Sequence, residues 1–412
     1  EGVDFGPCAC GRSTPRLRFH FDKGVENLIH IHELLHQMPA STPEVTRRPR
    51  RTTMGRRRNP LKADTILQGV LLVDKPEGLT SHDVCQKVRY CLRLGKVGHG
   101  GTLDPFATGL LPLMLNGATR LMPYMQTQDK MYDAVVRLGV RTDTLDPTGV
   151  ELERRDASGL ADEAVAAAVA AFVGKQTQTI PRYSAARIDG RHLYEYARAG
   201  EEVEQPEKEI EIFSISSGAL TRNEDGTVDV PLSVHCSVGT YVRALADDLG
   251  ARLGVGGHLL RLRRTGAGSL RVGAAVPLDR LVIESNLRRD GRNERAEEGD
   301  VTPFSADDNA RDWSSFLGDA LLPVAAVLGG VPVLGVTAAL VPRVDSGNPV
   351  RKREVIGLPG FADLTFAAGD RIVFQHPDGL RSLALVRAQV GRDAMGRLPD
   401  DGVVFKVERV LR

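Results

Sequence analysis

The residues best suited to chemistry lie in one glycine-rich stretch, which runs from Lys96 to Thr119 with the sequence KVGHGGTLDPFATGLLPLMLNGAT. Its glycines and prolines interrupt both the helical and the strand periods, so the stretch is predicted to form loops. Asp104 precedes a proline in a turn, where the glycines let the backbone approach a ligand closely. A carboxylate held in this way can act as a nucleophile. An Asp-Pro pair taken alone more often forms only an Asx-turn that caps a loop, so the rest of the chain must decide.

Predicted strands and helices flank this stretch on both sides. An apolar run from Gly69 to Lys75 predicts a buried strand, and a helix capped by Thr80 or Ser81 follows to about Leu94. The other elements predicted in this part of the chain are strands at 130–136, from 183 and at 228–238, and helices at 117–126, 160–173, 191–200 and 242–253. Because strands and helices interleave without strict alternation, the pattern indicates an α+β core.

Composition changes along the chain suggest where its domains begin and end. Residues 331–412 carry short apolar runs between Gly, Pro and Asp turns, which is typical of a small β-barrel. A mixed-charge polar stretch at about 288–312 predicts a linker or insertion between this barrel and the core. We therefore expect an N-terminal extension at 1–68, a catalytic domain at 69–287, a linker or insertion at 288–330 and a C-terminal domain at 331–412.

The overall composition is that of a globular protein. The chain has 412 residues, a formal net charge of +1 and 42% hydrophobic residues, which suggests two or three domains. No apolar run approaches the ~20 residues of a membrane span, and there is no signal-like start, so a cytoplasmic protein with reduced cysteines is expected. Eight basic residues and no acidic one lie between Arg47 and Lys62. This tract is either an RNA-binding arm or a solvated linker.

Five segments, taken in order, resemble the TruB family of tRNA pseudouridine-55 synthases. They are KPEGLTSHDV (75–84), GHGGTLDPFATGLLP (98–112), KMYDAVVRLGVRTDT (130–144), RYSAARIDGRHLYEYARAG (182–200) and CSVGTYVRALADDLG (236–250). The resemblance is strong over 69–285, and SGNPVR (346–351) weakly resembles a turn of the PUA-type RNA-binding domain. The chain departs from the family pattern at Gly100, which is expected to loosen the catalytic loop, and at Arg187, which stands where Lys is usual.

The resemblance implies a function, a fold and a set of site residues. The fold is an α+β pseudouridine synthase core with a mixed or antiparallel sheet, and the reaction converts a uridine of the tRNA T-loop to pseudouridine. Asp104 would be the nucleophile, Arg243 its charged partner and Tyr132 the ring that stacks on the flipped base and transfers protons. His99 would fill the stack that the base leaves. RNA binding or base flipping would further involve Lys75, Gly98, Thr102, Asp143, Tyr183, Arg187, Tyr241 and Arg351.

The same resemblance limits the cofactors and partners. The reaction involves no net redox change or hydrolysis, so no cofactor and no metal is expected. The expected partner is the T-arm of tRNA, with no guide RNA and no membrane, and the protein is expected to be a monomer. Two alternatives remain, a guide-RNA-dependent synthase of the dyskerin type and a non-catalytic RNA-binding or RNA-folding protein. The ATGLLP and LYEYAR segments favour the stand-alone enzyme, and the intact Asp104, Tyr132 and Arg243 argue against loss of catalysis.

The first 53 residues lie outside the synthase resemblance. HELLH at 32–36 formally matches the zinc protease motif HExxH, but Pro39 ends the predicted helix and no third ligand is evident. The stretch around it weakly resembles the closing strand and helix of ribosome-binding factor A. Met54 resembles an ordinary bacterial start. Our hypothesis is that residues 1–53 are a fused or misassigned remnant that contributes nothing to catalysis.

Overall fold

The computed structural model describes residues 67–125, 128–297, 306–379 and 381–411. The HELLH motif, the basic tract and the proposed remnant therefore lie outside the described residues. The chain divides into two units at Arg57–Arg58, and only the second unit, 58–412, contains described residues. Within the described ranges, none of the helices combines the length and the apolar character that crossing a membrane requires.

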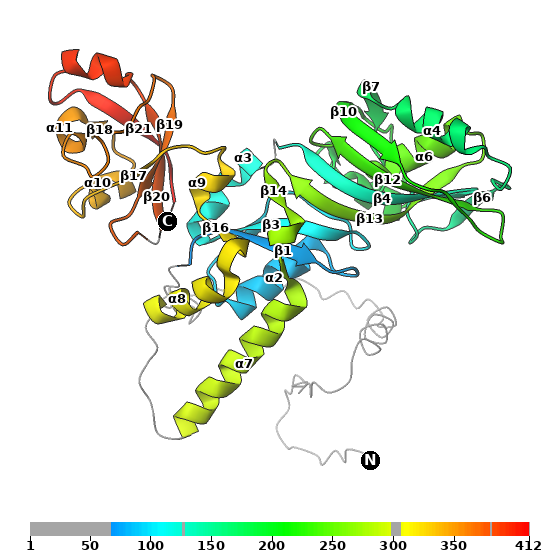
Figure 1. Cartoon of the computed structure of the whole chain (residues 1–412), viewed down its shortest axis with the longest axis horizontal. Helices are drawn as coiled ribbons and strands as arrows, with labels where there is room; N and C mark the ends of the chain where they lie inside the picture. The colour runs from blue at the N-terminus through cyan, green and yellow to red at the C-terminus, as the bar shows by residue number, and fades with distance from the viewer. Residues whose placement is uncertain (1–66, 126–127, 298–305, 380, 412) are drawn as a thin grey trace, which may run out of the picture. The chain divides into compact units, whose positions relative to one another are not determined.

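The second unit is built on a twelve-stranded mixed sheet, which confirms the predicted α+β class (Figure 1). Its main path runs in the order β15-β1-β3-β13-β4-β12-β10-β7. These strands are β15 (Val276–Pro277), β1 (Gly69–Lys75), β3 (Thr108–Leu115), β13 (Gly257–Ala267), β4 (Lys130–Leu138), β12 (Val228–Cys236), β10 (Glu207–Ser217) and β7 (Gly174–Thr179). Strand β4 is antiparallel to both of its neighbours, whereas β3 and β13 meet in only a short parallel pairing, Arg263 with Thr108 and Arg264 with Gly109.

That short pairing places the glycine-rich stretch in the middle of the sheet. Strand β2 (Val97–His99) pairs with β3, and residues 100–107 form the loop between these two strands. Gly109 allows the close approach of β13, because a Cβ there would lie 2.3 Å from the carbonyl oxygen of Arg264. The φ of Gly109 is also +98°, which disfavours any side chain. The loop that carries Asp104 is therefore fixed against the centre of the sheet.

Helices cover the apolar surfaces of this sheet. The principal ones are α2 (Ser81–Cys91), α4 (Asp162–Ala170), α6 (Val242–Arg252), α7 (Leu278–Glu297) and α8 (Ala306–Leu317). Helix α2 packs against α7, and α6 packs against β13 and β4. Valine and leucine side chains of α2 and α6, such as Val84, Val88, Leu245 and Leu249, are buried in one large apolar cluster with the strands. Burial of this apolar face accounts for the positions of both helices.

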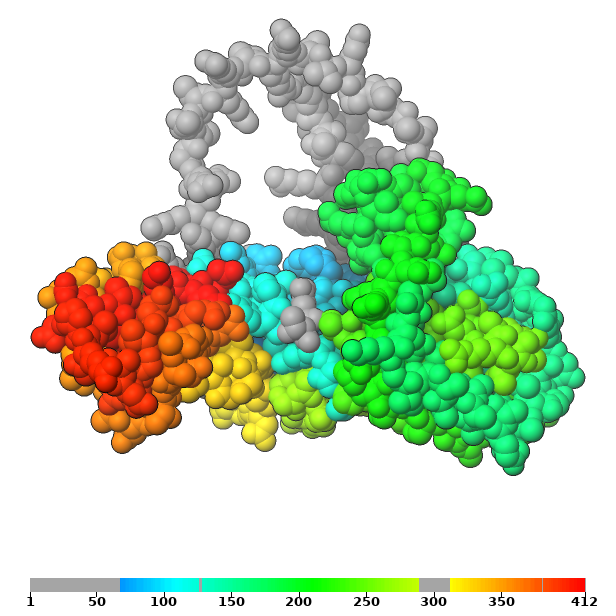
Figure 2. Space-filling view, turned by 90° about the horizontal axis from the view of Figure 1, so that it is seen from above, coloured from blue at the N-terminus to red at the C-terminus, as the bar shows by residue number. Residues whose placement is uncertain are grey.

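Two local predictions differ from the structure, namely the strand from 183 and the helix at 191–200, whose first two residues belong to a strand. Residues 183–185 form bends rather than the start of a strand, and the next strand, β8 (Arg187–Ile188), pairs with β9 (Arg191–His192) ahead of α5 (Leu193–Arg198). In the space-filling view, green atoms from the middle of the chain form a lobe that stands out from the rest of the domain (Figure 2). The Tyr183 carbonyl instead accepts a hydrogen bond from an arginine of the site described below.

The range expected as a linker or insertion, 288–330, contains helices among its described residues. It holds the second half of α7, all of α8 and the short α9 (Val324–Val327). Trp313 and Leu317 on α8 are buried in the large apolar cluster of the catalytic core. The guanidinium of Arg288 lies 4.5 Å from the centre of the Trp313 ring, so a charged side chain also supports this packing. The many charged residues of this range made its apolar face hard to recognise in the sequence. One apolar face is nevertheless enough to dock a helix.

The C-terminal part is a five-stranded curled sheet in the order β17-β19-β20-β21-β18, as expected for a small β-barrel-like domain. Its strands are β17 (Val333–Gly335), β19 (Arg371–Gln375), β20 (Ser382–Ala388), β21 (Val403–Val410) and β18 (Val350–Arg351), with short helices α10 (Val341–Asp345) and α11 (Lys352–Val355). A shared apolar cluster joins Val373, Leu385 and Leu411 of this domain to residues of β1 and β3. The Gln68 side chain donates to the Leu411 carbonyl at 2.6 Å and accepts from the Ser382 N–H at 2.6 Å.

Candidate active site

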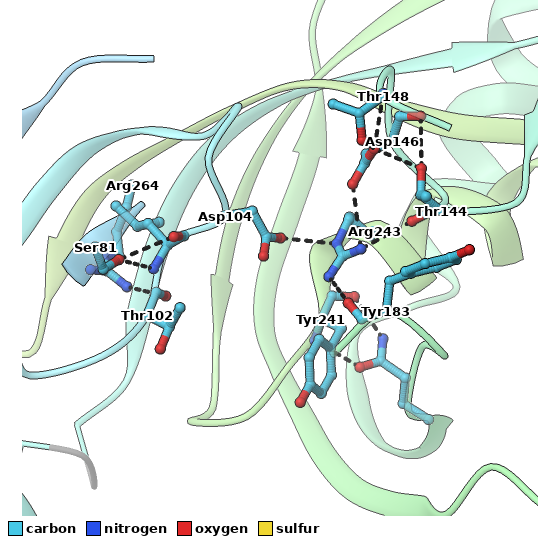
Figure 3. Close-up of polar contacts among 12 residues, drawn as sticks. Ser81, Thr102, Asp104, Thr144, Asp146, Thr148, Tyr183, Tyr241, Arg243 and Arg264 are labelled. Atoms are coloured by element: carbon cyan, nitrogen blue, oxygen red, sulfur yellow. Dashed lines mark hydrogen bonds and ion pairs between the residues drawn. The ribbon is translucent and has the colours of Figure 1, made fainter. Parts of the chain in front are cut away.

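Asp104 lies in a cavity of about 820 Å³ at the centre of the large sheet. The residues that line it come from loops and strands distant in sequence, and they include His99, Tyr132, Tyr183, Tyr241, Arg243 and Arg264. The sequence segments that resemble the family therefore converge on one cavity. Figure 3 shows the polar contacts around Asp104.

Two buried side chains hold the backbone of the Asp104 loop. Ser81 at the start of α2 accepts a hydrogen bond from the Leu103 N–H at 2.8 Å and donates to the Leu103 carbonyl at 3.1 Å. Lys75, which is fully buried, donates to the carbonyls of Pro105 at 3.0 Å and Ala107 at 2.6 Å. Burial lowers the pKa of Lys75 to about 8. Both side chains thus fix the loop from below, and Lys75 lies beneath the loop rather than on the surface.

The Asp104 carboxylate is paired with a single, well-held arginine. Nε of Arg243 lies 2.9 Å from Oδ2 of Asp104. The Nη1 group of Arg243 donates to the Thr144 carbonyl at 3.0 Å and lies 3.4 Å from Oδ2 of Asp146, while Nη2 donates to the Tyr183 carbonyl at 2.8 Å. The Arg243 side chain is only 5% exposed, so these four groups determine its orientation. The planar guanidinium therefore holds Asp104 in a fixed direction.

Asp146 is a site residue that the sequence analysis did not identify, because its Asp-Pro-Thr-Gly segment resembles an ordinary turn. Its Oδ1 accepts from the Thr144 hydroxyl at 2.7 Å, the Thr148 hydroxyl at 2.6 Å and the Thr148 N–H at 3.0 Å. These bonds satisfy one oxygen within the turn and leave the other to Arg243 (Figure 3). The turn is therefore a support for Arg243.

Burial and charge act in opposite directions on Asp104. Burial raises the pKa of its carboxyl, and the charge of Asp146 raises it further, whereas Arg243 lowers it. The net result is a pKa above the ordinary value of 3.8. A carboxylate that is less stabilised by its surroundings is also a better nucleophile, provided that the pH keeps it ionised.

This raised pKa predicts an acid limb in the rate of the reaction. As the nucleophile that the family resemblance implies, Asp104 would attack only in its ionised form, so the single-turnover rate should fall as the pH drops through a value above 3.8. The check is a pH series of single-turnover rates with RNA in solution and enzyme in excess, with folding followed by circular dichroism at each pH. A rate that is flat down to pH 4 while the fold persists would contradict a raised pKa at Asp104.

Tyr132 and Arg264 form a second pair on the wall of the cavity. They lie opposite one another on β4 and β13, so their side chains lie on the same face of the sheet, and both line the cavity. Burial raises the pKa of the Tyr132 hydroxyl, with Arg264 acting in the opposite direction. The tyrosine therefore rests as a neutral phenol. Arg264 belongs to a basic set (252, 261, 263, 264 and 271) in which no sequence signal distinguishes it.

Several other predicted residues also line the cavity. Tyr241 is braced by Gln178, which donates to the Tyr241 carbonyl at 3.1 Å and accepts from its N–H at 2.8 Å. His99 has a buried Nδ1 without a hydrogen-bond partner, and burial lowers its pKa, so the ring is neutral. Thr102 is exposed at the cavity edge. These residues contribute aromatic and neutral surfaces to the cavity.

Other residues singled out in the sequence support the backbone around the cavity. Asp143 accepts from the Val150 N–H at 2.7 Å and from the Tyr183 hydroxyl at 3.5 Å, so it braces one wall of the site. Gly98 is packed under Met122, whose Sδ would lie 2.6 Å from an added Cβ. Gly100 was expected to loosen the loop, but its N–H donates to the Pro112 carbonyl at 2.9 Å and it is buried. Side chains of Met114 and Met125 occupy the space that a larger residue would need.

Two predicted residues lie away from the cavity. Arg187 is exposed on the β8–β9 hairpin and donates to the Gly190 carbonyl at 3.4 Å. Arg351 lies in β18 of the C-terminal domain. In contrast, Tyr194 and Arg198 of α5 line the cavity although the sequence analysis did not single them out. The guanidinium of Arg198 lies 5.4 Å from the centre of the Tyr194 ring. In the sequence, only the resemblance of the LYEYAR segment to the family indicated this part of the chain.

No part of the described structure brings three or more His, Cys, Asp or Glu side chains together as a metal site. The fold is similar to that of two solved structures. The archaeal box H/ACA sRNP Nop10–Cbf5 complex matches with a TM-score of 0.53 and 23% identity, covering 86% of this chain and 89% of that chain. An H/ACA RNP bound to a substrate RNA containing 2'-deoxyuridine matches with the same TM-score and identity over 86% and 88%.

Sequence comparisons extend this likeness to the site. The model described as TruB family pseudouridylate synthase (N terminal domain) matches residues 89–242, and the model for the tRNA pseudouridylate synthase B C-terminal domain matches 243–328. The fold and the Asp–Arg–Tyr site therefore define a pseudouridine synthase. The chain belongs to the TruB family.

Curated relatives match over most of the chain. The tRNA pseudouridine synthase B of Burkholderia mallei is 40% identical over 342 residues, which cover 82% of this chain and 96% of that protein. The protein of the same name from Geobacter sulfurreducens is 38% identical over 77% of this chain and 95% of its own length. That of Thermobifida fusca is 47% identical over 53% of this chain and 76% of its own length.

Proposed function

We propose that the protein converts uridine 55 in the T-loop of tRNA to pseudouridine, and that it does so as a monomer in the cytoplasm without guide RNA. The observation that carries this proposal is the Asp104–Arg243 pair at 2.9 Å, which together with Tyr132 lines a cavity of about 820 Å³. The relatives named tRNA pseudouridine synthase B support the choice of tRNA. The structural likeness to H/ACA proteins, at 23% identity, concerns the fold alone.

The reaction has three parts that the site residues can perform. The bond between N1 and C1′ of the uridine breaks, the base turns, and C5 forms the new bond to C1′. Asp104 acts as the nucleophile that holds the sugar or the base covalently between the two bonds. One proton then leaves C5 and one is gained at N1, so the atoms balance without a redox partner. Tyr132 can relay this proton because it rests as a phenol.

Substrate binding requires that the base leave its stack in the RNA loop. Tyr132 and Tyr241 line the cavity and offer flat surfaces to the flipped base. His99 is a neutral ring beside the loop and is proposed to fill the vacated stack. Thr102, Gly98, Arg187, Arg198 and Arg351 are proposed to contact the RNA backbone. Lys75 and Asp143, in contrast, are proposed to act by bracing the loops around the cavity.

The decisive experiment adds the purified protein alone to an unmodified tRNA transcript. Nuclease digestion and chromatography separate pseudouridine from uridine, which have equal mass, and a transcript with cytidine at position 55 is the control. We expect one pseudouridine per tRNA, located at position 55. A requirement for a second, guide RNA would favour the guide-dependent alternative. Tight tRNA binding without product would favour a non-catalytic RNA-binding protein.

Tyr132→Phe should keep tRNA binding and lower the rate. The ring remains available for stacking, whereas the hydroxyl that relays the proton is lost, and this type of proton transfer contributes about 10²- to 10⁴-fold to rates. The measurement compares single-turnover rate and dissociation constant for the variant and for Tyr90→Phe, a surface tyrosine that is 70% exposed. An unchanged rate in Tyr132→Phe would remove the proton-relay role.

A further inference from the structure

Arg264 is a buried charge with an unusual set of partners. It is 1% exposed, and its guanidinium donates to the carbonyls of Leu110 at 2.7 Å, Gly101 at 3.1 Å and Thr102 at 3.4 Å. Tyr132 lies opposite it on β4, with its side chain on the same face of the sheet. Over the described ranges no carboxylate pairs with it, and the group that favours its charged form is Tyr132. A guanidinium is rarely kept this deep in a protein without an acidic partner.

The partners of Arg264 belong to the two parts of the proposed reaction centre, which are the Asp104 loop and Tyr132. Gly101 and Thr102 precede Asp104 in the catalytic loop, and Leu110 follows it in β3. Tyr132 faces Arg264 from the neighbouring strand β4. One rigid planar group is therefore bound to the loop of the nucleophile and lies beside the residue proposed as the proton relay. Its three carbonyl contacts fix its position, so the guanidinium has a defined place relative to both Asp104 and Tyr132.

The chemistry of the proton transfer gives this link a purpose. A phenol that donates its proton to N1 must exist as a phenolate until it takes the proton from C5. Tyr132 is partly buried, and burial makes this phenolate unfavourable. Lys130, the other cation on this wall, is directed at the carbonyls of Gln128 at 2.5 Å and Asp129 at 3.4 Å. Arg264 is thus the cation that faces Tyr132 from the neighbouring strand.

We propose that Arg264 is a positioning residue for proton transfer, which fixes the Tyr132 hydroxyl over the substrate and stabilises its transient phenolate. This inference rests on the proposed pseudouridine synthase function. In the step concerned, the C5–H bond breaks and its electron pair forms the C5–C6 double bond, while the π pair of the C6–N1 double bond moves to N1. The proton passes to the Tyr132 oxygen, and the proton of Tyr132 passes to N1. No charge or electron is gained or lost overall.

The test uses a tRNA transcript made with uridine deuterated at C5, compared with the ordinary transcript. Single-turnover rates are measured for the wild type, Tyr132→Phe, Arg264→Lys and Arg263→Lys. Arg263 is the matched control, because it is adjacent on β13 but forms a surface pair with Asp74 at 2.7 Å. We expect Arg264→Lys to slow product formation about 10- to 100-fold. Its tRNA affinity should stay within about threefold, since binding depends chiefly on phosphates and shape.

The isotope effect distinguishes positioning of Tyr132 from a general structural role. If proton transfer becomes the slow step, Arg264→Lys and Tyr132→Phe should both show a C5 isotope effect of about 2 or more, and Arg263→Lys should match the wild type. A slow Arg264→Lys variant without an isotope effect would overturn the proposal, because the earlier bond cleavage would then be limiting. Since the effect is a ratio of rates, it does not depend on the fraction of folded enzyme.

A double variant provides the second criterion. Adding Arg264→Lys to Tyr132→Phe should lower the rate by less than about threefold, because Arg264 acts through the hydroxyl that is already absent. Losses that multiply would overturn the proposal, as would failure of Arg264→Lys to fold, which would assign Arg264 to the fold alone. Absence of product with the wild-type protein would instead refute the proposed function itself.

Discussion

Asp104→Asn should abolish pseudouridine formation, with a rate lowered on the order of 10⁵-fold or more. Asparagine has almost the same shape and can still accept the hydrogen bond from Nε of Arg243, which lies 2.9 Å from the carboxylate. Its amide oxygen is not a nucleophile, so no covalent bond to the substrate can form. tRNA affinity should remain within about threefold, because binding depends chiefly on phosphates and shape.

Single-turnover product formation and filter binding measure the two quantities separately. Asp133→Asn is the matched control, since Asp133 is exposed on the same strand as Tyr132, with its side chain on the opposite face, where it accepts from the Ser233 hydroxyl at 3.2 Å. It should keep the wild-type rate. If Asp104→Asn still forms product at a tenth of the normal rate, Asp104 is not the nucleophile.

Arg243→Lys should lower the rate by about 10²- to 10³-fold while affecting tRNA affinity far less. One ammonium group cannot replace a guanidinium that contacts Asp104, Asp146 and the carbonyls of Thr144 and Tyr183 together. Lysine keeps the positive charge, so the pKa of Asp104 should change little. The orientation of the Asp104 carboxylate should change more. The loss should therefore appear in the chemical step.

The same substitution at the surface is the control. Arg141 forms a two-bond pair with Asp247, at 2.7 and 3.1 Å, and its side chain is 46% exposed. Arg141→Lys should leave the rate unchanged, because an exposed pair contributes little. Thermal melts of both variants show whether the fold persists. Equal losses of rate and affinity in Arg243→Lys would make Arg243 an RNA contact instead of a support for the nucleophile.

Local sequence was sufficient for the family, the α+β class and the residues that lie in conspicuous motifs. Asp104 stands in a loop of glycines and prolines, and Tyr132 and Arg243 stand in segments whose order along the chain matches the family. The structure brings these residues to one cavity. The alternation of apolar residues also indicated most strands and helices, because one face of each element must be buried.

Long-range contacts decided the rest. The role of Asp146 depends on Arg243, which lies 97 positions further along the chain, and that of Arg264 depends on the register of β13 against β4. The charge-rich stretch before α8 suggested a linker or insertion, and the apolar face that docks α8, which includes Trp313 and Leu317, is narrow. Motifs report which chemical groups are present, whereas strand pairing and burial determine which of those groups meet, and neither is a property of a local segment.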